Sequence, residues 1–321
     1  MDLRLVFLGT AGAVPTIERA PSSVLLIRGG ERFLIDCGEG TQRQLMRSAG
    51  MSRMDKIFIT HMHGDHYLGL PGLLKTLSLM GREEPLEIYG PAGLADLFRV
   101  AQRMFGRFAF PVDIKEVAVG PVHEGNGYQI TAVPTDHGLP SVGWLLAEAD
   151  RPGRFHPEKA VELGVTPGPA FGRLQSGQEV ENAEGRVVRP DEVMDERRPG
   201  RKILITGDTR PSEEVVQAIR GGSILVHDAT FTSEESDRAL ETRHSTAREA
   251  AQVATQAGVE LLVLTHISSR HSIRSLVSEA RKTFPNTLLP DDFDHLVVPY
   301  PDKGRPRLIR GGEELPEEAE G

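Results

Sequence analysis

Residues 57–66, which read IFITHMHGDH, are the most informative stretch for the fold of this chain. The first four residues are apolar or β-branched and predict a buried strand. His61, His63, Asp65 and His66 follow, so three imidazoles and a carboxylate stand at the end of that strand. These are the usual protein ligands of zinc and related divalent metals. The run therefore predicts a metal site, and the alternative is a polar loop whose histidines cap the strand or face solvent.

Three further apolar stretches end in a candidate ligand. Residues 130–136 lead to His137, residues 203–207 to Asp208, and residues 261–265 to His266. Strand ends commonly present functional side chains to a crevice. We therefore predict a two-metal site bridged by Asp208, because a carboxylate can offer one oxygen to each ion. The predicted ligands are His61, His63, Asp65, His66, His137, Asp208 and His266.

Five motifs, found in the same order as in a known family, give the chain a specific resemblance. They are FLGTAGAVPT (7–16), LIDCGEGTQ (34–42), TGDTR (206–210), RHST (243–246) and THISSR (265–270). With these motifs the chain resembles the ribonuclease Z (tRNase Z) family of the metallo-β-lactamase superfamily. The resemblance implies an α+β fold, a metallo-β-lactamase four-layer αββα sandwich over residues 1–310 with an inserted protruding arm.

Periodicity alone also allows two separate α/β domains, since each half of the chain offers strands and outer helices. On this reading each half supplies one sheet. Strands are expected at 202–206, 224–228, 261–265 and 295–299. Helices are expected near 40–50, 68–80, 91–105, 211–220, 245–257 and 270–281.

Residues 150–201 break this pattern. The segment is rich in proline, shows little periodic core and is too long for a passive connection. One interpretation is a disordered loop. The resemblance implies instead a flexible arm that serves as a tRNA exosite, although Arg151 to Lys202 carry ten Lys/Arg against nine Asp/Glu. The predicted RNA contacts, inside and outside the arm, are Arg19, Arg151, Arg154, Lys159, Arg173 and Arg270.

The hydrophobic content of the chain is typical of a packed protein, whereas its net charge is unusual for a protein that binds RNA. The hydrophobic content is 39% and there is one cysteine, so a disulfide framework within the chain is excluded. The net charge of −9 opposes RNA phosphates, although bound metal ions would add positive charge. Residues 311–321 predict a disordered acidic tail. No apolar stretch is long enough to span a bilayer, and we expect a cytoplasmic protein without a membrane partner.

The resemblance implies a function: a metal-dependent endoribonuclease that removes the 3′ trailer from precursor tRNA. A hydroxide held between two metals would attack the phosphorus, leaving a tRNA 3′-hydroxyl and a trailer with a 5′-phosphate. Asp65 would also orient the nucleophile, and His244, oriented by Asp228, would protonate the leaving oxygen. His244 could otherwise simply cap the helix that starts near Ser245. Two Zn²⁺ per subunit (or Mn²⁺) and a homodimer are implied by the same resemblance.

Several positions depart from the family pattern. Ala20 replaces an asparagine, Asp228 a glutamate, and Trp144 and His271 replace tyrosines. None is a predicted ligand. Three alternatives stay open: a phosphodiesterase or arylsulfatase acting on small esters, a non-catalytic RNA-binding subunit, and a redox diiron protein.

Overall fold

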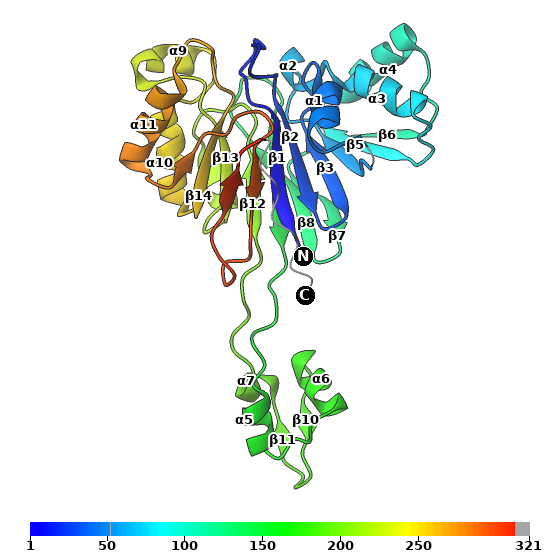
Figure 1. Ribbon diagram of the computed structural model, residues 1–321, viewed down its shortest axis with the longest axis vertical. Helices are drawn as coiled ribbons and strands as arrows, with labels where there is room; N and C mark the ends of the chain where they lie inside the picture. Colours follow the sequence, from blue (N-terminus) through cyan, green and yellow to red (C-terminus); the bar gives the residue numbers. More distant parts are fainter. Residues whose placement is uncertain (52, 312–321) are drawn as a thin grey trace. The chain divides into compact units, whose positions relative to one another are not determined.

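The computed structural model describes residues 1–51 and 53–311, so most of the predicted acidic tail lies outside the described residues. The chain divides into two compact units (Figure 1). The main unit comprises Met1–Ala147 and the chain from Lys202 onward, and the inserted unit comprises Glu148–Arg201. None of the described helices is long and apolar enough to cross a membrane.

Two mixed sheets form the centre of the main unit. The first sheet has eight strands, in the order β17 (Arg307–Ile309), β16 (His295–Val297), β1 (Leu3–Gly9), β2 (Ser23–Arg28), β3 (Glu31–Ile35), β4 (Lys56–Phe58), β5 (Leu86–Gly90) and β6 (Val112–Glu116). The second has seven, in the order β15 (Thr287–Leu288), β14 (Leu261–Thr265), β13 (Ile224–Asp228), β12 (Lys202–Ile205), β9 (Val142–Glu148), β8 (Tyr128–Pro134) and β7 (Gly120–Gly125).

Alternation along the strands separates the layers. In β1, Leu5 and Phe7 pack into the core between the sheets, whereas Val6 and Leu8 pack on the other face. Because side chains alternate with a period of two, one strand can serve two cores. The main unit therefore has three apolar layers. One lies between the two sheets, one lies on the outer face of the first sheet, and one lies on the outer face of the second sheet.

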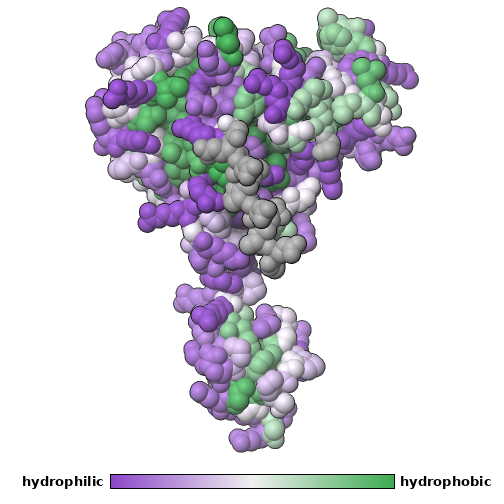
Figure 2. Space-filling view, in the orientation of Figure 1, coloured by the Kyte–Doolittle hydropathy of each residue, from purple (hydrophilic) through white to green (hydrophobic). Residues whose placement is uncertain are grey.

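Helices cover the outer face of each sheet (Figure 1). The first sheet is covered by α1 (Thr41–Arg47), α2 (Gly64–Tyr67), α3 (Leu70–Leu79) and α4 (Leu94–Phe105). The second is associated with α8 (Glu213–Ala218), η1 (Ser233–Glu235), α9 (Ser236–Glu241), α10 (Ala247–Ala257) and α11 (Ile273–Thr283). The main unit is thus the four-layer αββα sandwich of the metallo-β-lactamase fold. On its visible face in Figure 2, hydrophilic residues surround smaller hydrophobic groups.

The expectation that each half supplies one sheet is wrong. Strands β7, β8 and β9 from the first half join the second sheet, and β16 and β17 from the end of the chain join the first. β16 pairs antiparallel with β1, so the N-terminal strand is enclosed by pairing on both sides. Apolar periodicity identifies strands but not their neighbours, and for this reason the exchange could not be seen in the sequence.

The predicted elements mostly occur where expected, with errors at their ends. β13 and β14 have the expected bounds, whereas the helices predicted to begin at 211, 245 and 270 begin two or three residues later. Their caps explain the delay. Thr246 forms a capping box with Glu249 before α10, and the Ser272 side chain accepts from the Ser275 amide before α11.

The inserted unit has a small core of its own. It contains α5 (Pro157–Glu162), α6 (Pro169–Gln175), the hairpin β10 (Val180–Glu181) and β11 (Val187–Val188), and α7 (Pro190–Val193). Each short element contributes only one or two apolar residues, so no periodic pattern appears in the sequence. The core residues are Ala160, Val165, Leu174, Val180, Val188 and Val193.

The two ends of the inserted unit are joined by a buried ion pair. Arg201 donates to Glu148 through Nε at 2.7 Å and through a terminal nitrogen at 2.9 Å. Both side chains are almost fully buried. Such a bidentate arginine–carboxylate pair satisfies two charges that would otherwise be costly to bury.

Candidate metal centre

The predicted ligands are carried to one place by the ends of several strands. His61 follows β4, His137 follows β8, Asp208 follows β12 and His266 follows β14. His63 lies immediately before α2, and Asp65 and His66 lie within that short helix. All seven predicted ligands stand in two overlapping groups of side chains that could hold a metal ion. The structure therefore brings together residues spread over most of the sequence.

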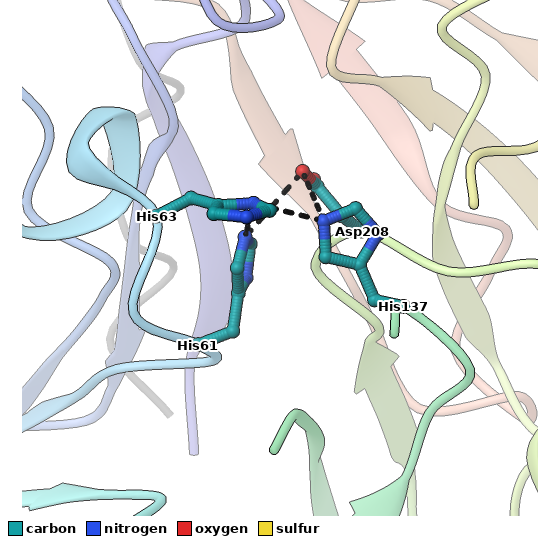
Figure 3. A group of neighbouring side chains, drawn as sticks. All are labelled: His61, His63, His137 and Asp208. Atoms are coloured by element: carbon teal, nitrogen blue, oxygen red, sulfur yellow. Dashed lines mark hydrogen bonds and ion pairs between the residues drawn. The ribbon is translucent and has the colours of Figure 1, made fainter. Parts of the chain in front are cut away.

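The first group consists of His61, His63, His137 and Asp208 (Figure 3). His63 Nδ1 lies 3.1 Å from His61 Nε2 and 3.0 Å from His137 Nε2. Asp208 Oδ2 lies 3.6 Å from the Nε2 atoms of both His61 and His137. Three ring nitrogens and one carboxylate oxygen thus face a common point.

The second group consists of Asp65, His66, Asp208 and His266. Asp208 Oδ2 lies 3.3 Å from His66 Nε2 and 3.2 Å from His266 Nε2. Asp65 Oδ2 lies 3.4 Å and 3.2 Å from the same two nitrogens. Asp208 is common to both groups, which is the placement that a bridging carboxylate requires.

These residues fit divalent cations. Tetrahedral zinc with bonds of 2.0–2.1 Å separates neighbouring ligand atoms by about 3.3 Å, and the separations above scatter around that value. In addition, two buried atoms, His66 Nε2 and Asp208 Oδ1, make no hydrogen bond with any described residue. Buried polar atoms normally have a partner, and here a metal would supply it.

Hydrogen bonds behind the ligands fix their orientation. The His66 Nδ1–H donates to Asp36 at 2.7 Å, and the His137 Nδ1–H donates to the Arg243 carbonyl at 2.8 Å. Asp36 also accepts from the amide of Thr60 at 2.8 Å. Because Nδ1 carries the proton in both histidines, Nε2 is left to face Asp208. Such outer contacts commonly set the tautomer of metal-ligating histidines.

The backbone beside the centre is strained. Asp36, Arg243 and His266 have backbone φ values of 58°, 59° and 60°, which residues other than glycine rarely adopt. Gly207, with φ of 63°, lies so close to Thr60 that a Cβ atom would stand 2.7 Å from its side chain. Only glycine fits there, and this contact brings Asp208 beside the histidine run.

Comparisons with known proteins assign the family. The model of the β-lactamase superfamily domain matches residues 31–267. Ribonuclease Z of Methanosarcina acetivorans is 49% identical over 303 residues, which cover 93% of this chain and 99% of that protein. Ribonuclease Z of Myxococcus xanthus is 46% identical over 302 residues, covering 93% and 98%. The crystal structure of human tRNase Z, short form, matches with a TM-score of 0.66 and 30% identity, covering 93% and 99%.

The chain belongs to the ribonuclease Z family. In this member of the family a further pair adjoins the metal ligands. His244 precedes α10, and its Nδ1–H donates to Asp228 at 2.9 Å. Burial lowers the pKa of His244, but the Asp228 carboxylate outweighs burial and raises it to about 9. This shift favours the imidazolium form of His244 at neutral pH.

The charges of the predicted ligands also suit metal binding. Burial and the neighbouring His66 lower the pKa of His61, which favours the neutral imidazole that binds a metal. Burial raises the pKa of Asp208, but the histidines His266, His66 and His61 hold it well below its usual value. Burial lowers the pKa of His66, but Asp208 and Asp36 outweigh burial and raise it well above its usual value. The centre therefore presents a neutral His61 beside an ionised Asp208, and a metal would displace the proton of His66 on binding.

The structure does not favour Arg19 as an RNA contact. Arg19 is buried, and its guanidinium donates to Thr10, to the Pro290 carbonyl at 2.9 Å and to Asp291. It anchors the loop that begins at Gly12. Arg270 is exposed in the main unit. In the inserted unit Arg154, Lys159 and Arg173 are exposed and Arg151 is half-buried.

Three side chains that contact the predicted ligands, Asp36, Thr60 and Thr230, are not among the residues predicted from the sequence. Asp36 lies within the motif LIDCGEGTQ, Thr60 directly precedes His61, and Thr230 lies two residues after Asp228. No spacing rule indicates that Asp36 reaches His66, because the two are thirty positions apart. The polar residues flanking each ligand were the available signal.

Proposed function

We propose that this protein is a metal-dependent endoribonuclease that removes the 3′ trailer from precursor tRNA. The products would be a tRNA with a 3′-hydroxyl and a trailer with a 5′-phosphate. The observation that carries the proposal is that six predicted ligands surround the seventh, Asp208, with the His244–Asp228 pair beside them. The close relatives named ribonuclease Z support the choice of substrate.

The metal site would hold two zinc ions, or manganese in their place. His61, His63 and His137 would hold one ion, Asp65, His66 and His266 the other, and Asp208 would touch both. When bound, such ions polarise a phosphoryl oxygen and lower the pKa of a water molecule. The side chains described below would supply the orientation and the proton transfer.

Asp65 would orient the attacking water. Its Oδ2 accepts a hydrogen bond from the Ala13 amide at 3.0 Å and lies beside His66 and His266. Burial raises the pKa of Asp65, but its contacts with His266 and His66 outweigh burial and lower it. An ionised carboxylate in this place would accept a hydrogen bond from the water and hold it in line with the scissile phosphate.

His244 would protonate the leaving ribose 3′ oxygen. An alkoxide is a poor leaving group, so cleavage needs a proton at that atom. His244 Nδ1–H is committed to Asp228, and Nε2 is the atom left to serve the substrate. His244 is also only partly buried, which fits a group that meets a substrate.

The inserted unit would bind the body of the tRNA through Arg151, Arg154, Lys159 and Arg173. A homodimer would let the inserted unit of one subunit serve the centre of the other. A tRNA substrate and a single buried cysteine both favour the cytoplasm as the compartment.

The test is cleavage of a 3′-extended precursor tRNA by zinc-loaded protein, with both new ends mapped. We expect one cut near the end of the acceptor stem that leaves a 3′-hydroxyl. The variant Asp208→Ala should lose activity together with bound zinc, and Asp237→Asn, an exposed carboxylate on α9, should retain both.

A small-molecule phosphodiesterase is the second candidate, and the net charge of −9 favours it. Bis(p-nitrophenyl) phosphate serves as its probe. Hydrolysis of this diester without any cleavage of precursor tRNA would refute the proposed substrate and would favour the second candidate.

A further inference from the structure

Two aspartate–threonine pairs lie behind the metal ligands. In the first pair, the Thr60 hydroxyl lies 2.9 Å from Asp36 Oδ2 and 3.0 Å from His61 Nδ1. In the second, the Thr230 hydroxyl lies 2.7 Å from Asp228 Oδ1 and 2.8 Å from His266 Nδ1. All four carboxylate and hydroxyl residues are buried.

The two pairs differ in what their carboxylates hold. Asp36 also accepts from His66 Nδ1–H at 2.7 Å, so the first pair serves two predicted metal ligands. The other oxygen of Asp228, Oδ2, accepts from His244 Nδ1 at 2.9 Å. The second pair therefore connects one predicted ligand, His266, with the proposed proton donor.

The direction of each hydrogen bond in the second pair follows from the available protons. Ionised Asp228 can only accept, so the single hydroxyl proton of Thr230 points to Oδ1. The Thr230 oxygen must then accept from His266 Nδ1–H. This leaves His266 Nε2 facing Asp208 and Asp65 at 3.2 Å each, as a ligand requires.

The two imidazoles are also packed together. The rings of His244 and His266 are stacked, with centroids 5.0 Å apart and planes 14° apart. A change at one ring is therefore felt at the other through direct contact as well as through Thr230 and Asp228. The backbone of His266 is also strained, with a φ of 60°, so contacts of its side chain have to maintain this conformation.

We infer that Thr230 is a positioning residue, which holds the proton donor His244 in register with the metal ligand His266 through Asp228. The inference rests on the proposed function, because it assigns His244 to the leaving oxygen. Without the hydroxyl, the Thr230 amide, at 2.9 Å, is the one donor to Asp228 Oδ1 among the described residues, while Oδ2 keeps the amides of Thr209 and Ser245. His266 Nδ1–H would lose its acceptor. Displacements of about 1 Å at such groups can reduce rates about 100-fold.

The test compares Thr230→Val with Thr230→Ser on two RNA substrates at saturating zinc. One is the natural precursor tRNA, and the other carries sulfur in place of the leaving 3′ oxygen, so that a thiolate departs without a proton. We expect Thr230→Val to slow cleavage of the oxygen substrate at least about tenfold more than cleavage of the sulfur substrate. Thr230→Ser, which keeps the hydroxyl, should restore the wild-type ratio of the two rates.

Thr60→Val is the matched control, because it removes the equivalent hydroxyl from the pair that serves only metal ligands. It should slow both substrates in parallel and weaken zinc binding, measured by competition with a chelator, by about 10- to 100-fold. A parallel loss on both substrates in Thr230→Val, or no loss, would overturn the inference. If the wild type cuts no RNA, the proposed function fails. The effect of Thr230→Val is then measured as the ratio of the rates on two small diesters, one with an alkyl and one with a p-nitrophenyl leaving group. A ratio that is the same in Thr230→Val as in the wild type would equally overturn the inference about Thr230.

Discussion

At the scale of the residue, a substitution at His244 should affect proton transfer without affecting metal binding. His244 lies outside the two groups of predicted ligands formed around Asp208, and its partner is the buried carboxylate of Asp228. Replacing it with alanine should reduce the cleavage rate of precursor tRNA by about 10²- to 10⁴-fold, the usual contribution of a general acid. Zinc content, measured by mass spectrometry on the purified protein, should stay at the wild-type level.

Two results would contradict this assignment. A His244→Ala enzyme with a normal rate would leave His244 only a structural part before α10. A loss of bound zinc would instead make His244 a ligand in solution, together with Asp208, Asp228 and His266, which form a third group able to hold an ion.

At the scale of the element, the sequence predicts the metal ligands better than the residues that hydrogen-bond to those ligands. Several predicted ligands directly follow an apolar strand, and both the strand and its end can be recognised from the hydrophobic pattern of the sequence, as for β14 and His266. The contact of Asp36 with His66, and of Arg243 with His137, depends on how separate elements pack. No local pattern encodes that packing. The pairing of β16 with β1 escapes prediction for the same reason.

Three adjacent strands of the first sheet share one charged cluster. Glu87 on β5 accepts from Lys56 on β4 and from Lys115 on β6. Burial raises the pKa of Glu87, but the two lysines outweigh it and lower the pKa to about 2, from 4.5. A carboxyl whose folded pKa is lowered stabilises the fold above its unfolded pKa, and this contribution disappears as the pH falls from about 4.5 towards 2.

Glu87→Gln should therefore reduce the free energy of unfolding by about 1 kcal/mol at pH 7, as for a partly exposed ion pair. Urea unfolding of both proteins at pH 7 and pH 3.5 measures the effect. The difference should shrink at the lower pH, because the Glu87 carboxyl of the unfolded wild type takes up a proton below about pH 4.5 while the folded protein still holds it ionised. A difference that is constant or grows on acidification would show that the lysines do not hold the carboxylate ionised.

At the scale of the whole molecule, an acidic protein has to bind a polyanion. The net charge of −9 cannot attract RNA, so the proposal requires local cations. The inserted unit offers exposed Arg154, Lys159 and Arg173 on a small fold with its own core. The main unit keeps its own three cores, and Ala147 pairs with Lys202, so a short linker could join β9 to β12 directly.

Replacing residues 151–199 with a short glycine–serine linker should therefore separate tRNA binding from chemistry. We expect hydrolysis of bis(p-nitrophenyl) phosphate to stay within about twofold of wild type, because no predicted ligand lies in the inserted unit. The affinity for precursor tRNA should fall, and its logarithmic dependence on salt should flatten by about 3 to 4 for four lost phosphate contacts. Filter binding over a range of salt concentrations measures both quantities. Salt-dependent binding that survives the deletion would move the RNA contacts to the main unit, where Arg270 is the remaining exposed candidate.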